Sequence, residues 1–206
     1  MKIYIIRHGE TDANKNKIMQ GWLDKPLNEN GIELAKEVGT NLKGIKFKEA
    51  FTSPLTRALE TCKLVLNNSD NSNCPIIIDE RIKELNMGDL EGKLIDSLDP
   101  NIIKELFSNP IGTPNGETKD EVINRTQAFL KELINRNDDN TYLVSTHGFA
   151  YRAMLNFLYA DPSNFWQGHV PYNCAISVIE AKDNKIELIE NDKIYYDNNK
   201  IIDRYK

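Results

Sequence analysis

The chain has 206 residues, of which 40% are hydrophobic and 28% are charged. This length and this balance are typical of a single globular domain over residues 1–206 and unlike those of disordered or collagen-like chains. The net charge of -5 argues against a nucleic-acid partner, since general nucleic-acid-binding proteins carry a surplus of basic residues. No apolar run approaches the roughly 18 residues of a membrane span, and the N-terminus is charged too early for a signal peptide, so we expect a cytoplasmic protein with no membrane partner.

Hydrophobic periodicity predicts an alternation of strands and helices along the chain. In chain order we expect a strand over 3–6, a helix over 30–42, a strand over 50–52, a helix over 55–66, a strand over 75–78, helices over 101–107 and 117–133, a strand over 142–144, a helix over 150–158, and a hairpin of strands over 175–180 and 185–189. The second helix is expected to open at Pro54 with Ser53 as its N-cap, and the hairpin to turn at Asp183 and Asn184. The pattern predicts an α/β fold: a three-layer α/β/α sandwich with a largely parallel central sheet and a C-terminal hairpin.

Two of the three histidines directly follow predicted buried strands. Arg7 and His8 come after the first strand, His147 comes after the strand over 142–144, and each of these histidines precedes a glycine. In open α/β sheets ligands bind outside the carboxyl ends of the strands, so both histidines are placed where active sites commonly form. His169 has no such placement, and we interpret it as a surface or core residue.

Histidine and arginine side chains at these positions suit phosphoryl transfer, which needs a nucleophile and groups that position and neutralise the phosphoryl oxygens. A neutral imidazole is a competent nucleophile near neutral pH without a metal, and neighbouring arginines favour the neutral form of His8. Arg7 and Arg57 carry a planar fork of donors that matches phosphate oxygens. The Gly148 amide, at the entry to a predicted helix, is a further candidate donor to an anion. No P-loop, GxGxxG or HExxH motif competes with this interpretation, and we expect no cofactor and no metal.

A phosphohistidine pathway also needs an acid for the departing alkoxide and then a base for the attacking water, and one carboxyl group can serve in turn. Glu84 is a candidate for this role. Spacing alone does not separate it from the neighbouring acidic residues Glu80, Asp89 and Glu91. On the residues alone, the choice among these carboxyl groups stays open.

Four separate motifs are distributed along the chain. They are Arg7-His8-Gly9-Glu10-Thr11 with Asn14, Gly21-Trp22-Leu23-Asp24-Lys25-Pro26-Leu27 followed by Gly31 and Ala35, Ser53-Pro54-Leu55-Thr56-Arg57-Ala58-Leu59-Glu60-Thr61, and Ser145-Thr146-His147-Gly148. Together these motifs resemble those of the histidine phosphatase superfamily, specifically its phosphoglycerate-mutase-like branch, and the resemblance covers nearly the whole chain. Glu84 stands four residues before Gly88 and eight before Gly92, at the place where that family carries its acid/base glutamate.

The resemblance implies that His8 is the phosphorylated nucleophile and that Glu84 exchanges the proton. The residues implied to hold the phosphate are Arg7, Arg57, His147, Asn14 and Gly148. Gln20 and Gly21 are implied to border the substrate. Pro26, Gly31 and Asn173 also match the family pattern, but we interpret them as turn and packing residues outside the site.

The fate of the phosphoryl group divides the family, because a phosphatase passes it to water and a mutase returns it to a substrate oxygen. Glycolytic mutases of the family carry added lid segments after the acid/base region, including an Arg-His-Tyr-Gly run that this chain lacks between Gly92 and Pro114. We therefore predict a phosphomonoesterase acting on a small phosphorylated metabolite. Phosphoglycerate mutase is the alternative, and a non-catalytic binder of phosphorylated ligands is a third.

Two features are left open by the sequence. Many phosphatases of this type have aromatic residues where this chain has Met87 and Leu90, so the resemblance does not settle which ester is preferred. The chain shows no coiled-coil heptad, and a monomer and a homodimer are equally compatible with it.

Overall fold

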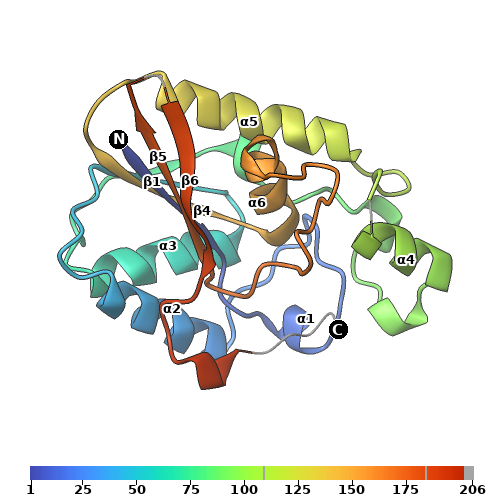
Figure 1. The fold of residues 1–206 in the computed structure, drawn as a ribbon. Coiled ribbons are helices and arrows are strands. Elements are labelled where there is room, and N and C mark those ends of the chain that lie inside the picture. Colours follow the sequence, from blue (N-terminus) through green and yellow to red (C-terminus); the bar gives the residue numbers. More distant parts are fainter. Residues whose placement is uncertain (109, 184, 202–206) are drawn as a thin grey trace.

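The computed structural model describes residues 1–108, 110–183 and 185–201, and six strands in this part of the chain form one mixed sheet (Figure 1). The strands are β1 (Lys2–Arg7), β2 (Glu49–Thr52), β3 (Ile76–Ile78), β4 (Thr141–Thr146), β5 (Ile176–Lys182) and β6 (Lys185–Lys193). Their order across the sheet is β3-β2-β4-β1-β5-β6. The first four are parallel, whereas β5 runs antiparallel to β1 and pairs with β6. The predicted α/β fold with a largely parallel sheet and a C-terminal hairpin is confirmed; Asn184, predicted in the hairpin turn, lies outside the described residues.

Helices cover both faces of the sheet. The α-helices are α1 (Asp12–Lys15), α2 (Glu29–Asn41), α3 (Thr56–Asn68), α4 (Pro100–Ser108), α5 (Lys119–Ile134) and α6 (Gly148–Leu155). The 3₁₀ helices are η1 (Glu80–Ile82), η2 (Gly88–Leu90), η3 (Ile95–Ser97), η4 (Asn156–Leu158) and η5 (Asn198–Lys200). Figure 1 shows α2 and α3 on one face and α5 and α6 on the other, which is the predicted three-layer arrangement. The helix predicted over 150–158 is divided between α6 and η4, and no helix in the described ranges is long and apolar enough to cross a membrane.

The side chains of the central strands belong to two separate hydrophobic cores, because successive residues of a strand point to opposite faces of the sheet. In β1, Ile3 and Ile5 belong to one core with Phe129 of α5 and Tyr151 of α6. Ile6 belongs to the other core, which includes residues of α2 and α3. Both faces of β1 are therefore buried, and this explains why its sequence is a continuous apolar run instead of an alternating one.

The parallel pairing brings the two predicted histidines together. Arg7 at the end of β1 is in register with Thr146 at the end of β4. His8 and His147, the next residues along each strand, leave the sheet at the same edge, and their ring centroids are 5.1 Å apart. The topology thus assembles at one edge two residues that are far apart in the sequence.

The start of α3 differs from the prediction. The helix begins at Thr56 with Leu55 in the N-cap position, where it provides no side-chain hydrogen bond. Asp24 supplies the missing acceptor, because its carboxylate accepts a hydrogen bond from the Thr56 amide at 2.8 Å. Ser53, the predicted cap, lies outside the helix; its hydroxyl accepts a hydrogen bond from the Leu55 amide at 3.3 Å and is 2.8 Å from Nε2 of His147. A residue from a distant loop has taken the capping role, and local spacing could not reveal it.

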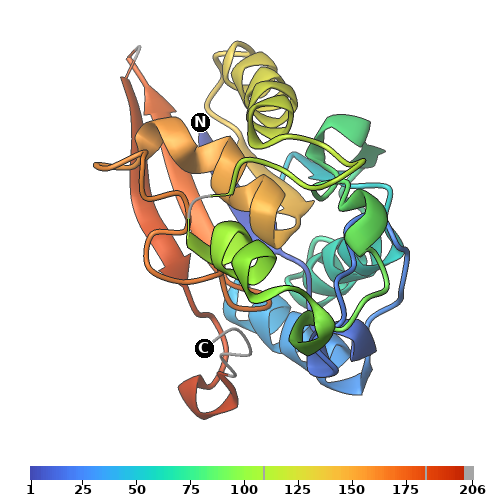
Figure 2. The ribbon, with the colours of Figure 1, turned by 90° about the vertical axis from the view of Figure 1, so that its right-hand side faces the viewer.

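The chain between β3 and α5 contributes a helix that lies outside the two helical layers. In Figure 1, α4 stands apart from them, on the side of the molecule that Figure 2 turns toward the viewer. Its Leu106 packs in a small apolar cluster with Met19 and Ile95. Trp166 fixes the end of α4, because its indole N–H donates a hydrogen bond to the Leu106 carbonyl at 2.8 Å.

Candidate active site

Eight of the nine predicted site residues line one pocket at the edge of the sheet where the histidines emerge. They are Arg7, His8, Asn14, Gln20, Gly21, Arg57, Glu84 and Gly148. The pocket encloses about 630 Å³ of empty space, a volume that includes the open solvent at its mouth. The ninth residue, His147, is fully buried next to His8 and does not form part of the pocket wall.

His8 has one imidazole nitrogen available for reaction because the other is occupied. Its Nδ1 lies 2.7 Å from the carbonyl oxygen of Gly9, and since a carbonyl can only accept, Nδ1 carries the proton. Nε2 therefore holds the lone pair of the neutral ring. Burial lowers the pKa of His8 well below its usual 6.5, and the positive charges of Arg57 and Arg7 lower this pKa further. The ring is consequently neutral, and nucleophilic through Nε2, at neutral pH.

The two arginines of the pocket are oriented by backbone carbonyls. Arg57 is almost fully buried and donates a hydrogen bond to the Gly21 carbonyl at 2.7 Å. Its Nε–H has no hydrogen-bond partner among the described residues, which leaves a buried donor for a ligand. Arg7 donates to the carbonyl of Pro171. Burial lowers the pKa of Arg57 to about 10, so its guanidinium stays charged at neutral pH and favours an anion in the pocket.

His147 lies against His8 and away from the pocket surface. Its Nε2 is hydrogen-bonded to the Ser53 hydroxyl, while its Nδ1 has no hydrogen-bond partner in the described part of the chain. Burial, with the charge of Arg57 next in effect, lowers the pKa of His147 well below 6.5, so this ring is also neutral. The contact between His147 and a phosphate stays a prediction.

Glu84 reaches the pocket from the segment that follows η1. Its carboxylate accepts hydrogen bonds from the backbone amides of Leu85 at 2.9 Å, Phe149 at 3.2 Å and Ala150 at 3.1 Å. The last two amides belong to the first turn of α6, where unpaired N–H groups and the helix dipole favour a negative charge. The start of α6 therefore holds the carboxylate of Glu84. Gly148 lines the pocket at the same helix terminus, and its role as a phosphate donor stays a prediction.

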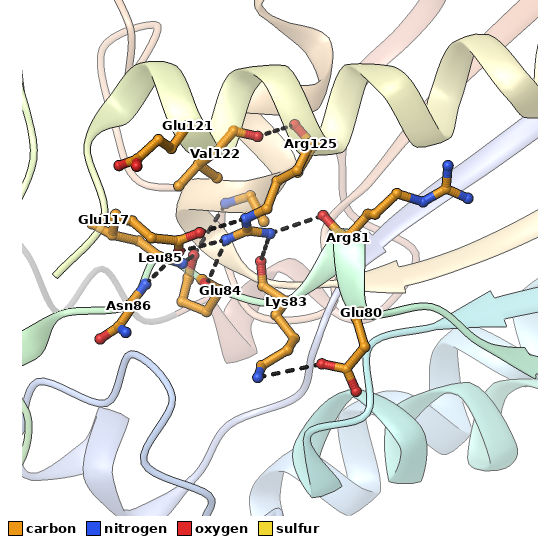
Figure 3. A network of polar contacts seen from close by, with 12 residues as sticks. Glu80, Arg81, Lys83, Glu84, Leu85, Asn86, Glu117, Glu121, Val122 and Arg125 are labelled. Atoms are coloured by element: carbon orange, nitrogen blue, oxygen red, sulfur yellow. Dashed lines mark hydrogen bonds and ion pairs between the residues drawn. The ribbon is translucent and has the colours of Figure 1, made fainter.

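The backbone that carries Glu84 is held by an ion pair between Arg125 of α5 and Glu117 (Figure 3). Arg125 donates hydrogen bonds to the carbonyls of Arg81, Lys83 and Glu84 at distances of 2.8, 2.7 and 2.8 Å. It donates two more to the Glu117 carboxylate, at 2.8 and 2.9 Å. Glu117 in turn accepts a hydrogen bond from the amide two residues after Glu84, at 2.8 Å. Neither residue is among those predicted from the sequence, because nothing in their local spacing links them to Glu84.

Asn14 belongs to α1, and Gln20 lies in the loop that follows this helix. The Thr11 hydroxyl is 3.2 Å from Oδ1 of Asn14 and 3.1 Å from Oε1 of Gln20, and Thr11 and Asn14 form the capping box of α1. Asn173, interpreted above as a turn or packing residue, also supports the site. Its side-chain amide donates a hydrogen bond to the His8 carbonyl at 3.0 Å, so it helps to hold the backbone of the predicted nucleophile.

The other ten of the eighteen residues that line the pocket are all apolar. Among them are Met87, Leu106, Phe107 and Trp166, which come from three separate parts of the chain. Leu106 and Phe107 belong to α4, the helix predicted over 101–107. The prediction gave this helix but not its place at the pocket wall. The apolar face of a helix is visible in its periodicity, but the surface that this face will cover is not.

The side chains of the pocket bring together a neutral imidazole, two guanidinium groups and a carboxylate. This set can bind an anion, attack it with a nitrogen nucleophile and exchange a proton. Within the described ranges, no group of three or more His, Cys, Asp or Glu side chains is arranged to hold a metal ion.

Comparison with known proteins finds relatives along most of the chain. The family model of the histidine phosphatase superfamily (branch 1) matches residues 3–192. Probable phosphoglycerate mutase GpmB of Escherichia coli O1:K1 / APEC is 29% identical over 188 residues, which cover 89% of this chain and 86% of that relative. Among solved structures, YhfR of Bacillus stearothermophilus is similar with a TM-score of 0.85 and 29% identity, covering 94% of this chain and 97% of that one. A mutant phosphoserine phosphatase from Entamoeba histolytica in complex with phosphoserine is similar with a TM-score of 0.77 and 26% identity, covering 92% and 95%. With a family model matched over most of its length and this edge-of-sheet pocket, the chain belongs to the histidine phosphatase superfamily, branch 1.

Proposed function

We propose that the protein is a phosphomonoesterase that hydrolyses small phosphorylated metabolites through a phosphohistidine at His8. The observation that carries the proposal is the hydrogen bond from Nδ1 of His8 to the Gly9 carbonyl, which leaves Nε2 as the lone-pair nitrogen of a neutral ring. The charges of Arg7 and Arg57 in the same pocket support an anionic substrate. Family membership supports phosphoryl transfer in general.

In the first half of the proposed reaction, Nε2 of His8 attacks the phosphorus atom of the bound ester. A P–N bond forms, the P–O bond to the alcohol breaks, and Glu84 donates a proton to the departing oxygen. The residues proposed to hold the phosphoryl oxygens are Arg7, Arg57, His147, Asn14 and Gly148, and those proposed to border the alcohol are Gln20 and Gly21. Arginine suits this task because its planar donors match the phosphoryl oxygens and remain charged throughout.

In the second half, a water molecule attacks the phosphorus atom of the phosphohistidine. Glu84, now a carboxylate, accepts a proton from this water, the P–N bond breaks, and its electron pair returns to Nε2 of His8. Inorganic phosphate leaves, and both side chains are restored. We include no metal in this scheme, because the imidazole supplies the nucleophile and the arginines supply the charge compensation.

The test of this proposal is phosphate release from 4-nitrophenyl phosphate in buffer containing a chelator. The wild-type protein is expected to be active, and His8→Ala is expected to be inactive. His169→Ala is the matched control, since His169 does not line the pocket, and it should retain wild-type turnover. Full activity of His8→Ala, or turnover only after a divalent metal is added, would contradict the proposal.

Phosphoglycerate mutase activity is the second candidate, and the name of the Escherichia coli relative is the observation in its favour. A mutase would convert 3-phosphoglycerate into 2-phosphoglycerate faster than it releases phosphate. A phosphatase would release phosphate as the main product. Following both products in one reaction by ³¹P nuclear magnetic resonance separates the two activities.

We also propose that the enzyme acts in the cytoplasm on a small molecule. Cys62, Cys74 and Cys174 are free thiols, which suits the reducing conditions of the cytoplasm. The lining of the pocket, a few polar and charged groups beside apolar side chains, suits a small molecule as the partner. A single domain over residues 1–206 and a monomeric or homodimeric state stay predictions.

A further inference from the structure

The pocket has two chemically different halves. One consists of the eight predicted site residues, six of them proposed to act on the phosphoryl group and two, Gln20 and Gly21, proposed to border the alcohol. Every other residue that lines the pocket is apolar. Two hydrophobic clusters meet in the apolar half: one contains Met19, Ile95 and Leu106, and the other contains Phe149 and Trp166. A phosphate ester also has two halves, a phosphoryl group and an alcohol. Beyond the part that Gln20 and Gly21 would border, the alcohol would therefore lie against this apolar surface.

The apolar surface is held in place by contacts among its own members. The rings of Phe107 and Trp166 are stacked, with centroids 6.3 Å apart and planes at 29°. Trp166 also meets Phe149 edge to face, with centroids 5.7 Å apart. The indole N–H of Trp166 is hydrogen-bonded to the Leu106 carbonyl of α4. Aromatic faces fixed in this way offer a preformed surface for an apolar group, and little ordering is needed when the group binds.

The charged side chains that line the pocket all belong to the half proposed to act on the phosphoryl group. Among the described residues that line it, the cationic side chains are Arg7 and Arg57, and the anionic one is Glu84. Phosphoglycerate and phosphoserine each carry a carboxylate in addition to the phosphate. That carboxylate would leave water for a surface of methyl groups and aromatic rings, and a buried charge without a partner is strongly unfavourable.

We infer that the substrate is the phosphate monoester of an uncharged, apolar alcohol, with an aromatic or branched aliphatic group seated against Met87, Phe107 and Trp166. This inference rests on the proposed function and names the substrate class of the same site. Burial of an aromatic ring against such a surface favours binding by an amount that corresponds to about tenfold or more in affinity.

The test compares 2-phenylethyl phosphate with O-phosphoserine. Both are esters of primary alcohols, so the reacting oxygen is matched and the rest of the alcohol differs. We expect kcat/KM of the wild-type protein to be at least tenfold higher for 2-phenylethyl phosphate. An equal or higher value for O-phosphoserine would overturn the inference. Failure to release phosphate from either ester, or from 4-nitrophenyl phosphate, would instead overturn the proposed function on which the inference rests.

Variants of the wall test the location of the alcohol. Phe107→Ala should lower the ratio of the two kcat/KM values about tenfold, because it removes one ring of the apolar surface. Phe157→Ala is the matched control, since Phe157 is 40% exposed and does not line the pocket, and it should leave the ratio unchanged. Phe107→Lys adds a cation to the wall and should shift the ratio toward O-phosphoserine. An unchanged ratio in both Phe107 variants would refute the placement.

Discussion

Replacement of Arg125 by methionine tests whether the ion pair behind Glu84 positions this carboxylate for proton transfer. Arg125→Met keeps an unbranched side chain but removes all five hydrogen bonds that the guanidinium donates. Three backbone carbonyls and the Glu117 carboxylate lose the guanidinium as a donor, although the Glu84 carbonyl keeps the Trp22 indole and the Glu117 carboxylate keeps a backbone amide. The side chains of Arg125 and Glu117 are each only 18% exposed. Water can therefore replace the lost bonds only in part.

The expected cost in the free energy of unfolding follows from these contacts. Each hydrogen bond to a charged group contributes about 1.5–3 kcal/mol, and breaking a buried pair costs about 3–5 kcal/mol. Because the pair is partly accessible to water, we expect Arg125→Met to lower the free energy of unfolding by about 3 kcal/mol, measured by urea denaturation. Arg136→Met is the matched control. Arg136 pairs with Glu49 on the surface and is 37% exposed, so a loss below about 1 kcal/mol is expected.

The catalytic consequence separates positioning from a general loss of structure. A general acid matters most for a poor leaving group, and 4-nitrophenolate needs little protonation to depart. If the ion pair positions Glu84, Arg125→Met should lower kcat/KM for 2-phenylethyl phosphate about tenfold more than kcat/KM for 4-nitrophenyl phosphate. The two substrates would be compared at a temperature where circular dichroism shows the variant folded. An equal loss for both substrates would refute the positioning role.

Three further predictions concern stability and reactivity. Burial lowers the pKa of His8 and His147 in the folded chain, while an unfolded histidine titrates near 6.5, so below that pH the folded state binds fewer protons than the unfolded state. As the pH is lowered below about 6.5, the free energy of unfolding, measured by urea denaturation, should therefore fall by up to about 1.4 kcal/mol per pH unit for each histidine. A constant free energy of unfolding between pH 7 and 5.5 would contradict this. Gly31→Ala should cost about 3 kcal/mol, because the new Cβ would lie 2.1 Å from a backbone oxygen, whereas Gly44→Ala meets open space and should cost only about 1 kcal/mol for its positive φ. A thiol reagent at pH 8 should label Cys74 first in the native protein, because burial raises the pKa of the other two thiols to about 12; equal rates for all three would be the contrary result.

Much of the fold could be predicted because its signals are local. The apolar run that forms β1 ends at Arg7, as predicted, and the helices α2, α3 and α5 begin and end within two residues of their predicted bounds. Buried parallel strands and amphipathic helices each have a characteristic period, which a short stretch of chain already displays. The predicted cap at Ser53 was wrong for the opposite reason, since the acceptor that replaced it comes from Asp24, more than thirty positions away.

Several contacts at the pocket could not be predicted from short stretches of sequence. Glu84 could not be separated from its acidic neighbours by spacing, and the family resemblance was needed to single it out. In the structure its carboxylate lies on the amides at the start of α6, more than sixty residues further along the chain. The role of Asn173 at the His8 carbonyl depends in the same way on a contact across the sheet.

The sequence by itself determined the order of strands and helices, the residues at the two strand ends, and the chemical types available for phosphoryl transfer. These are properties of short stretches of chain, set by backbone geometry and hydrophobic period. Only the tertiary structure decided that His147 lies buried beside His8, that Arg125 holds the backbone of Glu84, and that α4 adds Leu106 and Phe107 to the apolar wall of the pocket. Each of these features depends on contacts between segments that are far apart along the chain. Such contacts form only when both hydrophobic cores are packed.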